Sequence, residues 1–107
     1  MKNEIKVIIK KPIDPVGTTE SIRNDLETLQ RIVGGCIETI YIDVDGETAV
    51  MICNETGKLS RLKPNIWVGN DIICGTLIFC GVDGEEFDDT PIQLNEWVKL
   101  MEEWGNQ

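Results

Sequence analysis

The sequence offers many acidic side chains and no histidine to pair with them. Among its 107 residues are 19 Asp and Glu, ten Lys and Arg and no His, which gives a net charge of −9. Histidine is the commonest general base and the commonest metal ligand, so its absence disfavours both roles. The acidic balance also disfavours direct binding to a nucleic-acid backbone, which is itself negatively charged. We therefore expect binding in preference to catalysis, and no cofactor or metal site.

The negative charge is concentrated in the last two fifths of the chain. Residues 64–107 carry nine acidic side chains and one basic side chain, whereas residues 1–63 are nearly balanced. Five of these carboxylates lie close together: Asp83, Glu85, Glu86, Asp88 and Asp89. Such a run is usually only a solvated surface, but it also suits a basic protein partner or a cation. We expect the partner surface, and Trp67 is a candidate for it because tryptophan is enriched at binding hot spots, although its ring can instead plug an edge of the core.

Four cysteines could supply metal ligands, a disulfide or a nucleophile. They are Cys36, Cys53, Cys74 and Cys80, and none of them forms the C-x-x-C pair typical of zinc sites. A catalytic cysteine needs a lowered pKa, and no histidine is present to lower it. Three of the four stand inside apolar runs, where a free cysteine behaves as a small hydrophobic residue. We therefore expect reduced, buried thiols.

Glycines and one asparagine suggest a second kind of site, a pocket for a nucleotide or a metabolite. The candidates are Gly34, Gly35, Asn65 and Gly75, because glycine lets backbone N–H groups approach a ligand closely. A third hypothesis is an enzyme that uses clustered carboxylates with a divalent ion. It requires the carboxylates to converge in a cleft, which adjacency in the sequence does not establish.

The elements that must position these residues follow from the spacing of apolar side chains. Five runs rich in β-branched or apolar residues predict strands: 4–10, 16–22, 37–44, 48–54 and 71–82. Asp45-Gly46 between two of these runs is a strong signal for a hairpin turn. Within the last run, Gly75 indicates a bulge or a close approach of two backbones. Residues 58–70 are predicted to be mainly a loop.

Two helices complete the predicted fold. The first begins with Asn24 as N-cap, with Glu27 completing a capping box, and it ends at Gly34-Gly35. The second begins near Thr90-Pro91 and ends at Gly105, with an apolar stripe that includes two tryptophans. The order β-β-α-β-β-β-α predicts a single α+β domain over residues 1–107. We expect a mostly antiparallel sheet of about five strands, with both helices packed on one face.

The apolar runs also bear on location. None approaches the roughly 20 residues that are needed to span a bilayer. The N-terminal residues lack the apolar stretch of a signal peptide. We therefore expect a cytoplasmic protein that does not bind a membrane.

Residues 24–38 and two later motifs resemble a known family. The run from Asn24 to Glu38 resembles its L-x-x-L-Q-x-x-V-G-G-x-I-E core. Pro64-Asn65 and the segment Ile73-Cys74-Gly75-Thr76 resemble a later Pro-Asn pair and an I-x-G-T strand. The family is domain of unknown function 3846, an uncharacterised group found in bacteriophages, plasmids and conjugative elements. The resemblance extends from Ile5 to about Phe87.

This resemblance implies a compact α+β domain in a mobile-element context, and it implies no catalytic residues. Together with the charge distribution, it leads us to expect a small non-catalytic accessory protein of a phage or mobile element. Its partner would be a protein with a basic surface, bound through the acidic C-terminal part of the chain. A homodimer is a further expectation if an apolar patch around Trp67 or Trp104 is exposed.

Overall fold

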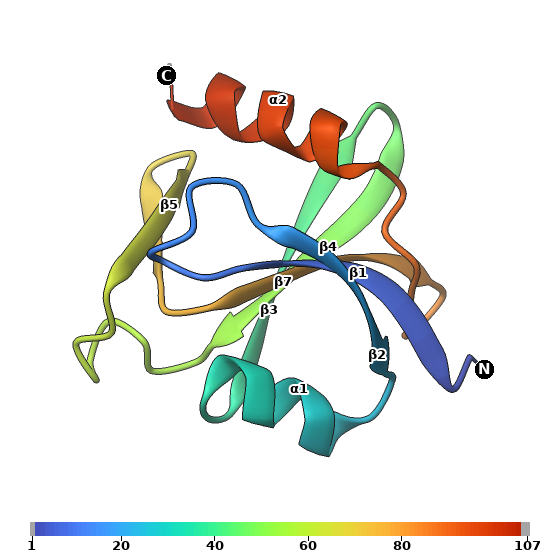
Figure 1. Ribbon diagram of the computed structural model, residues 1–107, viewed down its shortest axis with the longest axis horizontal. Coiled ribbons are helices and arrows are strands. Elements are labelled where there is room, and N and C mark those ends of the chain that lie inside the picture. The colour runs from blue at the N-terminus through green and yellow to red at the C-terminus, as the bar shows by residue number, and fades with distance from the viewer. Residues whose placement is uncertain (1, 106–107) are drawn as a thin grey trace.

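The computed structural model describes residues 2–105, and its centre is an antiparallel sheet with one helix on each side (Figure 1). Six strands form this sheet: β1 (Glu4–Lys10), β2 (Thr18–Arg23), β3 (Ile37–Val44), β4 (Glu47–Asn54), β7 (Leu77–Asp83) and β8 (Glu86–Asp88). Their order is β2-β1-β7-β4-β3, and β8 pairs with β7 off this path. The predicted α+β class and the antiparallel character of the sheet are confirmed.

The remaining elements are a small second sheet and two helices. Their bounds are β5 (Pro64–Val68), β6 (Asp71–Cys74), α1 (Leu26–Val33) and α2 (Leu94–Gly105). β5 and β6 pair with each other, and the order of helices and strands along the chain is broadly as predicted. No helix within residues 2–105 is long and apolar enough to cross a membrane.

The two helices cover opposite faces of the main sheet, so the prediction that both pack on one face is wrong. On one face Trp97 of α2 packs with Phe79 of β7, and on the other Leu29 of α1 packs with Ile78. The reason lies in the central strands, where every residue of β4 from Ala49 to Asn54 is buried. A strand with apolar residues on both faces must be covered on both faces of the sheet. A strand in which apolar and polar residues strictly alternate must be covered on one face only.

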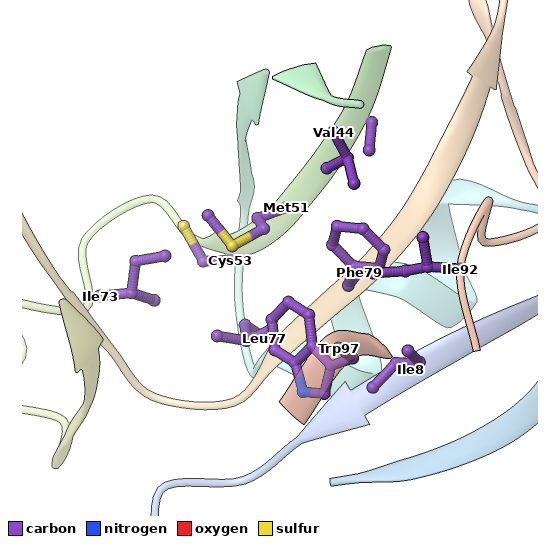
Figure 2. Packing of buried hydrophobic residues seen from close by; sticks show 10 residues of the cluster. Ile8, Val44, Met51, Cys53, Ile73, Leu77, Phe79, Ile92 and Trp97 are labelled. Carbon is purple, nitrogen blue, oxygen red and sulfur yellow. The ribbon is translucent and has the colours of Figure 1, made fainter. Parts of the chain in front are cut away.

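Trp97 is the largest fully buried side chain and anchors α2 to the sheet (Figure 2). Its ring centroid lies 4.9 Å from that of Phe79 and 5.8 Å from that of Trp104. Its indole Nε1 donates a hydrogen bond of 3.0 Å to the carbonyl oxygen of Val16. The loop between β1 and β2 is thereby tied to the same helix, and the indole N–H is not left without a partner in the core.

Residues 71–82 form two strands, not one, and the break between them is at Gly75. The backbone of Gly75 has a φ of 89°, and a Cβ there would lie 2.8 Å from Cδ1 of Leu62. The close neighbour is the Leu62 side chain, whereas the prediction was a bulge or a close approach of two backbones. The chain bends here, so β6 leaves the main sheet and pairs with β5, which lies in the predicted loop. Pro64 and Gly69 favoured a loop, but the three residues Ile66 to Val68 are strong strand formers.

The structure confirms the predicted hairpin turn and the predicted end of α1 but not the predicted N-cap. The Asp45-Gly46 hairpin is confirmed, with φ of 53° and 86° at its two residues, as in a type I′ turn. The left-handed end of α1 at Gly34 is also as predicted. The N-cap is Asp25, whose Oδ1 accepts from the Thr28 amide at 2.8 Å, and not Asn24. The Asn24 side chain instead donates to backbone carbonyl groups of two other segments.

Candidate functional site

Two hairpin turns lie at the same end of the main sheet. β3 and β4 are joined by Asp45-Gly46, and β7 and β8 are joined by Gly84-Glu85. Because β4 and β7 are antiparallel neighbours, with Ala49 opposite Gly81, the start of β4 lies near the end of β7. Both turns therefore project from one end of the sheet; in Figure 1 the β3–β4 turn is at the upper right beside α2, and the β7–β8 turn is lower on the right.

Six carboxylates lie within two residues of these two turns, and we call them the acidic end. They are Asp43, Asp45, Glu47, Asp83, Glu85 and Glu86. All of them are exposed except Glu86, which is half-buried. Within residues 2–105 none of the six takes part in a salt bridge. Solvated charges of one sign that are not neutralised by the chain attract a partner of opposite charge and speed its approach.

Helix α2 extends this negative surface on one side. A shallow depression of about 380 Å³ lies between α2 and the β3–β4 hairpin. Four of its lining residues are acidic, one is basic and three are apolar. The acidic residues are Asp43, Asp45, Glu96 and Glu103, the basic residue is Lys99, and the apolar residues are Val44, Ile92 and Leu100. The surface available to a basic partner therefore includes acidic residues of the first half of the chain, although residues 1–63 are nearly balanced in net charge.

Asp88 and Asp89, two of the five carboxylates predicted for the partner surface, are held by the chain itself. The Lys2 ammonium lies 2.8 Å from Oδ1 of Asp88 and 2.7 Å from Oδ2 of Asp89. The Lys6 amide also donates to Oδ1 of Asp89 at 2.8 Å. These hydrogen bonds, with Lys2 as the main donor, hold the pKa of both carboxyl groups below its usual range. They fasten the end of β8 to β1, whereas Asp83, Glu85 and the half-buried Glu86 form no salt bridge among residues 2–105.

Trp67 does not lie at the acidic end. It is in β5, which packs beside α2 on the left in Figure 1, away from the turn between β7 and β8. Its side chain is 54% exposed, so it does not plug the core edge. The predicted partner residues therefore occupy two separate regions, one aromatic and one acidic.

Two of the four predicted ligand residues meet in one depression. Gly34 and Gly75 both line an open, mainly apolar hollow of about 440 Å³, together with Lys11 and Lys63. Gly35 is not among the lining residues, and a Cβ on it would lie 2.8 Å from the side-chain nitrogen of Asn54. The glycine there allows close packing of the chain.

Asn65 connects this region to Lys10, a residue that the sequence did not single out. The Lys10 ammonium donates to Oδ1 of Asn65 at 2.7 Å and to the Lys11 carbonyl at 3.3 Å. The Asn65 amide donates to the carbonyl groups of Lys10 and Gly75, both at 2.8 Å. Lys10 is only 4% exposed, and burial lowers its pKa, partly offset by the charge of Asp14. The only sequence signal was the Pro64-Asn65 pair, and nothing marked Lys10 as its partner.

The cysteines divide into two buried and two more accessible thiols. Burial raises the pKa of Cys53 to about 11 and that of Cys80 to about 12, which keeps both protonated at neutral pH. Cys36 is exposed, so the expectation of burial is wrong for this residue, and Cys74 is half-buried. In the part of the chain that the structure describes, no three His, Cys, Asp or Glu side chains are placed to hold a metal ion together.

Comparison with known proteins gives one finding. A family model described as a domain of unknown function, DUF3846, matches residues 5–104, which is nearly the whole chain. The comparisons with curated proteins and with solved structures gave no match.

Proposed function

The chain belongs to the DUF3846 family, whose description carries no activity, and from this premise we propose that it is a non-catalytic protein that binds a basic protein partner through its acidic end. The observation that carries the proposal is the placement of six carboxylates beside two turns at the same end of the sheet. None of the six forms a salt bridge among residues 2–105. Like charges held together cost stability, and a complementary partner relieves that cost.

The proposal includes a cellular setting. The protein acts in the cytoplasm as an accessory protein of a phage or mobile element. Its partner belongs to machinery that presents a basic surface, such as proteins that handle nucleic acid or defend the host. The family resemblance supports the mobile-element context, and the net charge of −9 supports a basic protein in preference to the nucleic acid itself.

The test compares two charge reversals of equal size. One variant carries Asp83→Lys, Glu85→Lys and Glu86→Lys. The matched control carries Glu20→Lys, Glu27→Lys and Glu102→Lys, three exposed positions that belong to neither hairpin and do not line the depression beside α2. Each immobilised protein is incubated with a lysate of the organism that carries the gene, and bound proteins are quantified by mass spectrometry. We expect the first variant to lose a partner that the wild type and the control retain. Equal retention by all three, or equal loss in both variants, contradicts the proposal.

A second candidate function is the binding of a small ligand in the hollow where Gly34 and Gly75 meet. Its apolar lining and the presence of Lys11 and Lys63 suit a compound with an apolar body and a negative group, such as a nucleotide. The test is titration of isotope-labelled protein with a panel of nucleotides, observing the amide signals of the two glycines. Absence of a shift at both glycines, at millimolar ligand, contradicts this function.

A further inference from the structure

Strand β3 is the outermost strand on one side of the main sheet. It pairs with β4 over its whole length, from Ile37 opposite Asn54 to Val44 opposite Glu47. Within residues 2–105 no other strand pairs with it. An uncovered outer strand presents a row of backbone N–H and C=O groups that another strand can use.

The turn between β3 and β4 determines which backbone groups are presented. A two-residue hairpin turn makes Val44 and Glu47 a hydrogen-bonded pair, and the bonding then alternates along the strand. The amide of Glu55 donates to the Cys36 carbonyl at 2.8 Å, which keeps the same alternation at the far end. The outward groups therefore belong to Ile37, Thr39, Tyr41 and Asp43. No hydrogen bond found in the described part of the chain uses them.

Side chains on both faces of β3 suit an added strand. Ile40 and Ile42 are half-buried beside the core on the α2 face, and Tyr41 on the other face is 60% exposed. β3 has no proline, no lysine and no bulge, which are the common means of protecting an outer strand. The opposite outer strand, β2, is polar and mostly exposed. β3 is thus the better suited of the two.

The charge of this hairpin selects the occupant. Residues 37–54 carry four acidic side chains and no basic side chain: Glu38, Asp43, Asp45 and Glu47. A second copy of the chain would bring another net charge of −9 to the same edge, which opposes pairing of two copies. A strand with basic side chains is attracted by the same carboxylates.

We propose that β3 receives an extended, basic segment of the partner protein, which adds to the sheet as a further strand beside it. The inference rests on the proposed function and specifies how the partner is held. Backbone hydrogen bonds to the groups of Thr39 and Tyr41 supply affinity, as in other cases of strand addition. Alternate side chains of the segment contact Ile40 and Ile42, and the basic side chains between them lie over Tyr41 and Asp43.

The first test uses an acetylated, amidated peptide of four Lys-Val repeats as the probe. Its valines can face one side of the added strand and its lysines the other. Binding is followed by fluorescence anisotropy, and amide hydrogen exchange is measured in the protein by NMR. We expect exchange at Thr39 and Tyr41 to slow at least tenfold on binding, and a Glu-Val peptide not to bind. A Lys-Val peptide that does not bind, or that binds with unchanged exchange at both amides, overturns the proposal.

The second test changes the protein. Thr39→Pro removes an outward N–H without removing a bond to β4, whereas Thr39→Val keeps the N–H and the strand preference. We expect Thr39→Pro to bind the peptide at least tenfold more weakly and Thr39→Val to bind it as the wild type does. Equal binding by both variants overturns the proposal. If thermal melting shows that Thr39→Pro is unfolded, the exchange measurement on the wild type decides.

Two further outcomes separate this proposal from its alternatives. Sedimentation equilibrium that shows a dimer of the wild type, lost in Thr39→Pro, would make a second copy the occupant and overturn the basic segment. Loss of the cellular partner on reversal of Asp83, Glu85 and Glu86, but not on Thr39→Pro, would leave the proposed function standing without strand addition. Loss in both variants supports both proposals.

Discussion

The ammonium group of Lys10 lies 2.7 Å from Oδ1 of Asn65, although the two residues are 55 positions apart in the sequence. Lys10 ends β1, and Asn65 is in β5, so this contact joins the main sheet to the small one. The same asparagine donates to the carbonyl groups of Lys10 and Gly75. One side chain thus holds together three segments at the point where the chain leaves the main sheet.

Asn65→Leu should therefore be strongly destabilising. It removes the main acceptor of a buried ammonium and the donor for two carbonyl groups, and each buried group left without a partner costs about 1–3 kcal/mol. We expect a loss of about 2–4 kcal/mol in the free energy of unfolding, measured by urea denaturation. Asn95→Leu, at an exposed position of α2, is the control and should change it by less than about 1 kcal/mol. Equal losses in the two variants would show that the Lys10 contact is not important.

Gly75→Ala should destabilise the bend between β6 and β7. A side chain at a φ of 89° is strained by about 1–2 kcal/mol, and the new Cβ would lie 2.8 Å from Leu62. Leu62→Ala in the same chain should relieve the contact with Leu62 but not the backbone strain, so the two substitutions should couple in a double-mutant cycle. Gly105→Ala is the control, because nothing lies within 4 Å of its Cβ position. A neutral Gly75→Ala variant would contradict the close approach.

The contact of Lys2 with Asp88 and Asp89 predicts a dependence of stability on pH. The pKa of both carboxyl groups is lowered from 3.8 in the folded chain, so the unfolded chain binds more protons as the pH falls. Their contribution is complete above about pH 4–5 and is lost as the pH falls through the folded values. Lys2→Met should therefore lower the denaturation midpoint at pH 7 and have a smaller effect at pH 2–3.

Lys6→Met is the matched control for this prediction. The Lys6 side chain forms no salt bridge in the described part of the chain, and its contact with Asp89 uses the backbone amide, which the substitution keeps. Its effect should be small at both pH values. If the denaturation midpoints of the wild type and Lys2→Met differ by the same amount at pH 7 and at pH 2–3, the ion pair adds nothing to the stability of the fold.

The sequence predicted what depends on neighbouring residues and missed what depends on distant ones. The Asp45-Gly46 turn and the left-handed Gly34 are local, because each follows from the backbone freedom of one or two residues. The burial of Lys10 was not predictable, since a lysine that ends an alternating strand is ordinarily solvated, and its partner comes from a segment that was expected to be a loop.

The candidate site divides in the same way. The acidic run after Val82 was visible in the sequence. Lys2, which forms salt bridges with Asp88 and Asp89 of that run, is more than 80 positions away. The carboxylates of the β3–β4 hairpin join the site only because β4 and β7 are neighbours in the sheet. Trp67 is close to the acidic run in sequence and far from it in the fold, because the bend at Gly75 sends β5 and β6 to the other end (Figure 1).

If the acidic end is a binding site for a basic partner, repulsion between its carboxylates should lower the stability of the free protein. Exposed charges of one sign on two adjacent hairpins repel one another, and salt screens the repulsion over about 10 Å at 0.1 M. We expect the Tm of the wild type to rise between 10 and 200 mM NaCl. The triple variant Asp83→Asn, Glu85→Gln and Glu86→Gln should melt at a higher temperature than the wild type in low salt and respond less to added salt. The matched triple variant Glu20→Gln, Glu27→Gln and Glu102→Gln should keep more of the wild-type response, since its carboxylates do not lie together. A wild-type Tm that falls with salt, or the same response in both variants, would mean that the acidic end is not a site of repulsion and would remove the physical basis for a partner that relieves it.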